Sequence, residues 1–261
     1  MPELSLGQYE LVYNMLSLTI ACMFASFVFF VLSKNTVSPR YRGSVIASAI
    51  VVFIAGYHYV RIFGSWEGAY QLAGGGGSYV ATGEPFNDAY RYVDWLLTVP
   101  LLMVELVLVL SLSAALTKEL IAKLGVAAFL MIALGYPGEI DRESTELFSN
   151  RGLWGFLSTI PFVYILYTVF TQLKIAMGKA SKEVAVLLRN AGLLTLFTWG
   201  FYPIAFMAPF YGLQGGDAEA ILQVGYSIAD ITAKCGYGLI IFAIARLRSA
   251  EEGYEGAVSH K

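Results

Sequence analysis

The chain has 261 residues, of which 57% are hydrophobic and 14% are charged, and its mean hydropathy is +0.63. This composition is typical of membrane proteins with several spans and argues against a soluble enzyme. The net charge of −2 excludes the basic surface of a nucleic-acid-binding protein. Cys22, Cys235 and the two histidines lack metal-ligand spacing, so no metal site is expected. We expect a single membrane domain over residues 1–261 that is not an enzyme.

Apolar runs long enough to cross a bilayer as helices recur seven times along the chain. They predict an all-α bundle of seven transmembrane helices. The runs are approximately Tyr9–Leu32, Ser44–Phe63, Asn87–Leu110, Leu120–Tyr136, Leu153–Leu173, Val184–Phe210 and Ala218–Arg246.

The joints between these runs alternate in charge. Because basic residues favour the cytoplasmic side, the alternation predicts an outside N-terminus and a cytoplasmic C-terminus. The basic joints contain Lys34, Arg40, Arg42, Lys118, Lys123, Lys174, Lys179, Lys182, Arg189, Arg246 and Arg248. The acidic joints contain Glu67, Glu84, Glu139, Asp141, Glu143, Glu146, Asp217 and Glu219.

Two segments outside the spans carry separate expectations. Gly74–Gly77 and the β-forming residues that follow it predict either a flexible loop or a short outside hairpin between the second and third helices. The polar segment 249–261 is expected to be a flexible tail beyond the last helix.

A lysine and an aspartate, Lys234 and Asp230, lie in the middle of the seventh run, one helical turn apart. Placing either charge in hydrocarbon costs roughly 2.5–3.5 kcal/mol. One interpretation is a structural ion pair within the bundle. The other is a lysine that carries a covalent ligand, with the aspartate as its counter-ion.

The third run places Arg91, Asp94, Thr98 and Glu105 on one helix face, at spacings of three, four and seven residues. Asp94 and Glu105 would lie about 16 Å apart along the axis. Arg91 favours an ionised Asp94, whereas the apolar neighbours of Glu105 favour its protonated form. Two carboxylates at different depths indicate a proton route, with static, neutralised packing groups as the alternative.

His58 in the second run is either a packing group or a titrating partner of Asp94, because both lie in the outer halves of their helices. Trp95, Trp199 and Tyr202 are typical of an ordinary aromatic core. They would also suit a flat, conjugated ligand.

These residues together resemble the microbial rhodopsins, and most of all the xanthorhodopsin-like outward proton pumps, over essentially all seven spans. The motifs that carry the resemblance are Arg91-Tyr-Val-Asp94-Trp-Leu-Leu-Thr98, Asp230-Ile-Thr-Ala-Lys234, Trp199-Gly-Phe-Tyr202-Pro203 and Leu134-Gly-Tyr-Pro-Gly-Glu139.

The resemblance implies that Lys234 binds all-trans retinal as a protonated Schiff base. It implies that Asp94 is the main counter-ion and first proton acceptor, and that Asp230 is the second counter-ion. Glu105 would be the cytoplasmic proton donor. The residues that would wall the retinal are Tyr92, Trp95, Met131, Ser158, Trp199, Tyr202 and Phe206.

The same resemblance assigns the other polar residues of the site. His58 would bond to the acceptor carboxylate, and Arg91 would be the outward gate. Asp94, Thr98 and Glu105 form the set that distinguishes the family's proton pumps from its chloride pumps, sodium pumps and sensors. Leu222 stands where a release glutamate of the haloarchaeal pumps would fall, so the release group is open.

Gly155 would open a side window to the retinal ring, against which a hydroxylated carotenoid (a xanthophyll) could lie as an antenna. The alternative is that Gly155 only permits close helix packing. The resemblance further implies a homo-oligomer, with a pentamer as our guess, among the lipids of a bacterial plasma membrane. The alternative functions are a retinal-based photosensor that signals to a partner protein and a seven-helix receptor without a covalent ligand.

Overall fold

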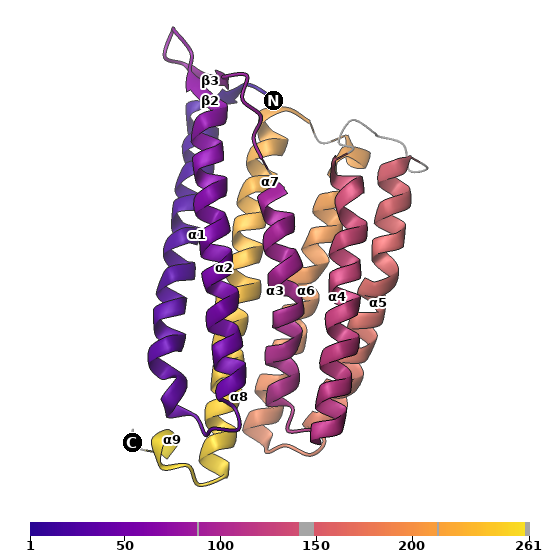
Figure 1. Ribbon diagram of the computed structural model, residues 1–261. Coiled ribbons are helices and arrows are strands. Elements are labelled where there is room, and N and C mark those ends of the chain that lie inside the picture. Colours follow the sequence, from indigo (N-terminus) through magenta and orange to yellow (C-terminus); the bar gives the residue numbers. More distant parts are fainter. Residues whose placement is uncertain (88, 141–148, 213, 259–261) are drawn as a thin grey trace.

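The computed structural model describes residues 1–87, 89–140, 149–212 and 214–258 (Figure 1). Within them, seven spans are long and apolar enough to cross a membrane, which confirms the predicted bundle. Six are single helices: α1 (Leu6–Ser33), α2 (Arg42–Ala69), α3 (Ala89–Val109), α4 (Ala114–Ile140), α5 (Asn150–Met177) and α6 (Lys182–Phe206). The seventh joins α7 (Gly215–Asp230), the π-helical segment η3 (Ile231–Gly236) and α8 (Tyr237–Glu251).

Side-chain caps fix where several helices begin. Ser5 forms a capping box at the start of α1, in which its hydroxyl accepts from the Gln8 amide and the Gln8 side chain accepts from the Ser5 amide. Ser149 and Ser181 cap α5 and α6 in the same position. These caps satisfy amides that a helix start leaves without partners, and they keep the first turns in register.

Of the two alternatives for the segment between the second and third spans, a flexible loop or a short hairpin, the structure forms the hairpin. Strands β2 (Tyr70–Leu72) and β3 (Ser78–Ala81) pair antiparallel, and Gly76 adopts φ 73° in the turn between them. A third strand, β1 (Leu4–Ser5), pairs with β3, so the sheet order is β1-β3-β2. We did not expect β1, because two residues show no sequence period. This end of the bundle is called the sheet end below, and the end that carries α9 (Glu255–Val258) is called the tail end (Figure 1).

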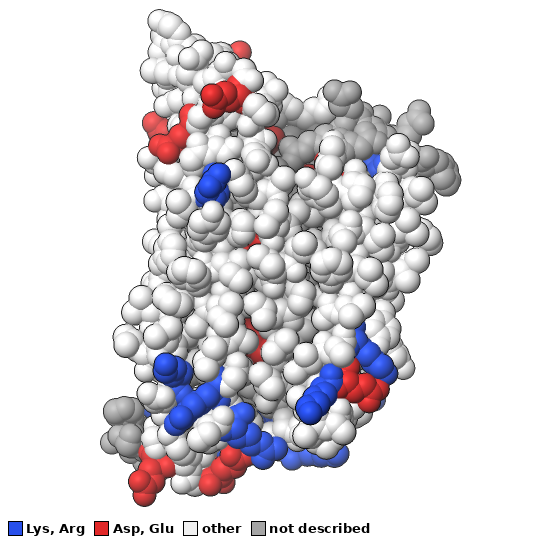
Figure 2. Space-filling model, in the orientation of Figure 1, with Lys and Arg blue, Asp and Glu red and all other residues white. Residues whose placement is uncertain are grey.

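Charge separates along the bundle (Figure 2). On the face shown, most lysines and arginines lie near the tail end, together with some acidic residues, and other acidic residues lie around the sheet end; the belt between the two ends is largely uncharged. The acidic residues Asp141, Glu143 and Glu146 lie outside the described residues. This distribution agrees with the charge alternation in the sequence.

The segment from Ser249 differs from the expected flexible tail. Helix α8 continues to Glu251, and α9 follows it at Glu255–Val258. The Tyr41 hydroxyl donates to Glu252 Oε1 at 2.7 Å, and the Tyr254 hydroxyl donates to the Asn35 carbonyl at 3.1 Å. These bonds dock the segment on the joint between α1 and α2. Polar tail residues therefore have protein partners that their own sequence does not reveal; residues 259–261 lie outside the described part.

Candidate functional site

The three charges predicted to lie mid-membrane meet at one point inside the bundle. Lys234 Nζ lies 2.7 Å from Asp94 Oδ2 and 2.9 Å from Asp230 Oδ1. All three side chains are at most 2% exposed. A buried ammonium needs such partners, because removing one of them leaves an uncompensated charge in a medium of low dielectric constant. Helices α3 and α7 thus supply one carboxylate each to a single lysine.

Hydrogen bonds from three aromatic side chains fix Asp230. The Tyr59 hydroxyl donates to Oδ2 at 2.7 Å, and the Tyr202 hydroxyl donates to Oδ1 at 2.6 Å. Trp95 Nε1 donates to Oδ1 at 3.4 Å. Donors directed at a carboxylate stabilise its ionised form, so Asp230 is held as an anion with a fixed orientation.

Lys234 lies within η3, the π-helical stretch of the seventh span. π-Helical turns interrupt the regular register and are frequent at functional sites. Here the stretch begins directly after Asp230 and covers the residues up to Gly236. The local change of register therefore affects the lysine and its immediate neighbours and leaves α7 and α8 regular.

The hydrogen bonds around Asp94 differ from one expectation, the bond implied for His58. The Thr98 hydroxyl donates to the Asp94 main-chain carbonyl at 2.9 Å. His58 Nδ1 and Asp94 Oδ1 are both buried and without a hydrogen-bond partner among the described residues. The implied bond between His58 and the acceptor carboxylate is therefore not formed through these atoms. Both residues are nevertheless buried where predicted.

Arg91 lies on the sheet-end side of Asp94 and is 1% exposed. Its Nη2 donates to Gln223 Oε1 at 2.6 Å, and its guanidinium carbon lies 4.9 Å from the centre of the Tyr226 ring. The gate expected at this position is thus a buried cation, held between an amide and an aromatic face.

Glu105 is fully buried on the tail-end side of the same helix. It accepts a hydrogen bond from the Ser48 hydroxyl of α2, and its Oε1 has no partner among the described residues. No ion pair to Glu105 occurs within the described part of the chain. An isolated carboxyl group in such a site favours its protonated, neutral form.

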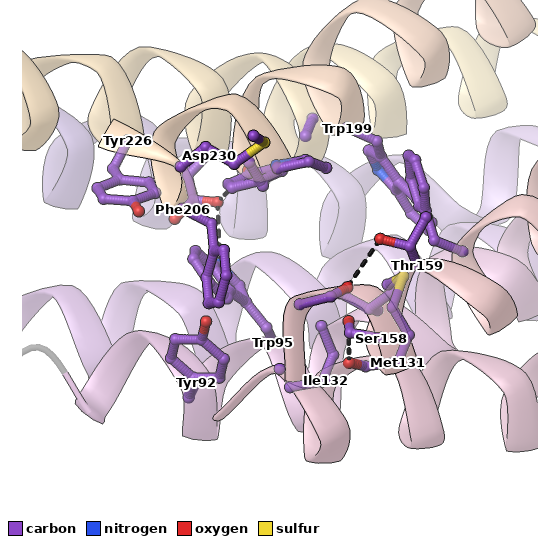
Figure 3. Close-up of a pocket in the computed structure, with 18 of the residues that line it drawn as sticks. Tyr92, Trp95, Met131, Ile132, Ser158, Thr159, Trp199, Phe206, Tyr226 and Asp230 are labelled. Atoms are coloured by element: carbon purple, nitrogen blue, oxygen red, sulfur yellow. Dashed lines mark hydrogen bonds between the residues drawn. The ribbon is translucent and has the colours of Figure 1, made fainter. Parts of the chain in front are cut away.

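A cavity of about 310 Å³ extends from Lys234 between the helices (Figure 3). Every residue predicted to bind the cofactor lines it. They are Tyr92, Trp95, Met131, Gly155, Ser158, Trp199, Tyr202, Phe206 and Lys234. Its volume is within the range of about 300–1,000 Å³ of small-molecule sites. The lining is mainly aromatic and aliphatic, with a primary amine at one side, as a long apolar aldehyde requires.

Two glycines shape the cavity wall around Phe206. A Cβ added at Gly155 would lie 2.7 Å from Phe206 Cε1, and one at Gly138 would lie 2.8 Å from Phe206 Cζ. Arg151 contacts the same region. Its Nη2 donates to the Phe206 carbonyl at 2.6 Å and forms an ion pair with Glu139 at 3.0 Å. Gly155 therefore permits close packing against Phe206, and it lines the cavity as well.

Sequence reasoning missed several polar residues of the site, including Tyr59, Ser48, Gln223 and Arg151. Tyr59 directly follows His58, and Ser48 lies in an apolar run, but Tyr and Ser are common packing residues in membrane helices. Their partners lie on other helices, more than 50 residues away for Ser48. A spacing rule within one helix could not find them.

Comparison with known proteins agrees with this geometry. Residues 10–247 match the family described as bacteriorhodopsin-like protein. The chain belongs to the bacteriorhodopsin-like family. The solved structure of xanthorhodopsin, a light-driven ion pump with a dual chromophore, is 60% identical and covers 97% of this chain and 100% of its own, with a TM-score of 0.92.

Two further bacteriorhodopsin-like relatives are similar. A thermophilic rhodopsin structure is 55% identical, covers 97% of this chain and 99% of its own, and has a TM-score of 0.91. The green-light absorbing proteorhodopsin of Gamma-proteobacterium EBAC31A08 is 30% identical over 87% of this chain and 84% of its own length. Membership of this family makes the protein a multi-pass membrane protein with retinal as its chromophore. The cavity that ends at Lys234 fits that group.

Proposed function

We propose that the protein is a light-driven outward proton pump in which retinal is bound to Lys234. The observation that carries this proposal is that α3 places two buried carboxylates at different depths, one beside the buried lysine of the seventh span and one toward the tail end. Asp94 contacts Lys234 Nζ at 2.7 Å, and Glu105 lies about 16 Å further along α3 toward the tail end. Retinal would supply, when bound, visible-light absorption and an isomerisation beside the Lys234 nitrogen.

Asp94 is the proton acceptor in this proposal. Its Oδ2 is already within hydrogen-bonding distance of Nζ, so a proton needs to move only along an existing contact. Asp230 also contacts Nζ, but its three aromatic donors stabilise the anion and so oppose its protonation. Of the two counter-ions, Asp94 is therefore the one that accepts, and Asp230 stays ionised.

Glu105 is the proton donor. Burial without an ion pair keeps it protonated, and the bond with Ser48 holds the carboxyl group in place. It lies toward the tail end, away from Asp94, so it can return a proton to the Lys234 nitrogen only from that side. Loss of a proton on one side and its return from the other produce one net transfer along the bundle.

The direction of transfer follows from the charges at the two ends. Basic residues concentrate at the tail end on the face in Figure 2, which favours the cytoplasm for that end. Asp94 lies on the sheet-end side, so its proton leaves to the outside. The test uses cells that express the protein with added retinal, in unbuffered salt under green light. External acidification that a protonophore abolishes is expected; coloured protein without a pH change would favour the photosensor.

We also propose that a hydroxylated carotenoid binds at Gly155 as an antenna. In support, the cavity includes Gly155, Phe156 and Thr159 of α5, and Phe156 is 67% exposed on the outer surface of the bundle. The dual chromophore of xanthorhodopsin, which is 60% identical, adds support by similarity. The test is to add a xanthophyll to the purified retinal-loaded protein and to Gly155→Trp. Carotenoid bands should appear in the excitation spectrum of the unmodified protein and vanish in the variant; their absence in both would contradict the proposal.

A further inference from the structure

A second cavity of about 180 Å³ lies at the sheet end and has no part in the transfer described above. Its lining includes two carboxylates, Glu139 and Glu219, together with Arg151, Gln223 and Tyr226. These two carboxylates and the arginine make the cavity a polar site at the end of the bundle where the proton is expected to leave. The question is which group at this end passes the proton to water.

One face of the seventh span connects this cavity to the lysine. Glu219, Gln223, Tyr226, Asp230 and Lys234 follow one another at spacings of four, three, four and four residues, which keeps them on one side of the helix. Gln223 is 2% exposed and Asp230 is fully buried, whereas Glu219 is half-buried at the cavity. Glu219 and Asp230 lie about 16 Å apart along the axis. The face thus runs from the buried charges to the surface.

Hydrogen bonds link the surface carboxylate to the buried arginine. Gln223 Nε2 donates to Glu219 Oε1 at 2.9 Å, and Gln223 Oε1 accepts from Arg91 Nη2 at 2.6 Å. Because both ends of the amide are engaged, Gln223 fixes the distance between the guanidinium and the carboxylate. A displacement of Arg91 would therefore be transmitted to Glu219 through this amide.

Tyr226 separates the two cavities, because it lines both of them. Figure 3 shows its ring beside Asp230 at the edge of the chromophore cavity. The guanidinium of Arg91 lies 4.9 Å from the centre of that ring. A proton that leaves Asp94 toward the sheet end passes this pair before it reaches the outer cavity.

We propose that Glu219 is the proton-release group and that Gln223 is the positioning residue that couples it to Arg91. This inference rests on the proposed pumping function. In the step, the O–H bond of protonated Asp94 breaks, an O–H bond forms on the Glu219 carboxylate, and that bond then breaks as the proton passes to bulk water. Glu139 is the competing carboxylate, but Arg151 binds it at 3.0 Å with only 2% of the arginine side chain exposed. Protonation of Glu139 would disrupt that buried pair.

The experiment compares Glu219→Gln with Asp217→Asn in purified, retinal-loaded protein. Asp217 is a matched control, because it lies two residues before Glu219 in α7 but accepts from Gln8 at 2.6 Å and does not line the outer cavity. A flash starts the cycle, and a pH-sensitive dye in the medium reports when the proton appears. Glu219→Gln should delay the dye signal by about tenfold or more relative to the step at Asp94, whereas Asp217→Asn should not. An unchanged delay in Glu219→Gln would overturn the proposal.

Two further measurements separate the coupling role from a structural one. Gln223→Leu keeps the carboxylate but removes the bridge, so it should delay release without changing how fast Asp94 is protonated. Light-minus-dark infrared spectra should contain a carboxyl band that Glu219→Gln abolishes and Asp217→Asn retains. Normal release in Gln223→Leu would remove Gln223 from the proposal, and persistence of every carboxyl band in Glu219→Gln would overturn it. If the unmodified protein releases no proton after a flash, the pumping function itself fails.

Discussion

Lys234 Nζ and Asp94 Oδ2 lie 2.7 Å apart, although 140 residues separate them in the chain. This contact joins the π-helical stretch of the seventh span to α3, and Asp230 completes it at 2.9 Å. Burying a lysine between two carboxylates costs desolvation free energy. Removing one of the partners costs more, because it leaves an uncompensated buried charge. The contact therefore fixes the register of two helices, and it also places an amine at one side of the cavity.

Two substitutions of Lys234 should separate its charge from its covalent chemistry. Lys234→Ala and Lys234→Arg should both abolish visible absorbance, because neither side chain can form an imine with an aldehyde. In the absence of retinal, Lys234→Ala should destabilise the fold by about 3–5 kcal/mol, since it leaves buried carboxylates without their cation. Lys234→Arg keeps the positive charge and should lose less stability than Lys234→Ala. Absorbance spectra and thermal unfolding in detergent provide the check, and colour in either variant would contradict the attachment site.

The hydrogen bonds to Asp230 can be tested by two tyrosine substitutions of the same type. Tyr59→Phe removes a 2.7 Å donor to the carboxylate and should destabilise the protein by about 1.5–3 kcal/mol. Tyr237→Phe is the control, because the Tyr237 hydroxyl is buried without a hydrogen-bond partner among the described residues. The thermal unfolding midpoint of Tyr59→Phe should be clearly lower than that of Tyr237→Phe. Equal losses would show that the bond to Asp230 contributes little.

Gly155 and Gly200 provide a matched pair of glycines in neighbouring helices. Gly155→Ala places a Cβ 2.7 Å from Phe206 and should cost about 1–3 kcal/mol through overpacking. Gly200→Ala meets nothing within 4 Å and should be neutral or stabilising. Combining Gly155→Ala with Phe206→Leu should recover part of the loss. Unfolding midpoints of the three variants measure this, and a destabilising Gly200→Ala would count against the packing argument.

Arg151 and Arg40 contrast a buried ion pair with an exposed one. Arg151→Gln breaks the pair with Glu139 and the bonds to the Phe206 carbonyl, so it should destabilise the protein by about 3–5 kcal/mol. Arg40 pairs with Glu252, but the two side chains are 55% and 37% exposed, and Arg40→Gln should change stability by only about 0–1 kcal/mol. Chemical or thermal unfolding decides between these values; a small effect at Arg151 would contradict its role in holding the cavity wall.

The sequence was most informative where chemistry and helical spacing coincide. Lys234, Asp230, Asp94 and Glu105 are ionisable groups in apolar runs, so their burial could be predicted. All the predicted lining residues reach the cavity. The seven spans follow from hydropathy, whereas the glycines and β-forming residues leave the hairpin as one of two alternatives.

The remaining features depend on contacts between distant segments. Strand β1 is two residues long and forms only because β3 offers it an edge. The π-helical register of η3, which contains Lys234, leaves no mark in the residue pattern. Gln223 and Glu252 are ordinary polar residues until Arg91 and Tyr41 are placed beside them. Such partners are set by the tertiary structure and not by local spacing.

The transfer of a proton from Lys234 to Asp94 is the central claim, and light-driven acidification by Asp94→Asn tests it most directly. Cells that express Asp94→Asn or Glu105→Gln with retinal are compared with cells that express the unmodified protein, under green light with and without a protonophore. Asp94→Asn should abolish acidification, whereas Glu105→Gln should retain a slower rate that a small permeant weak acid restores. Acidification by coloured Asp94→Asn at the unmodified rate would contradict the account.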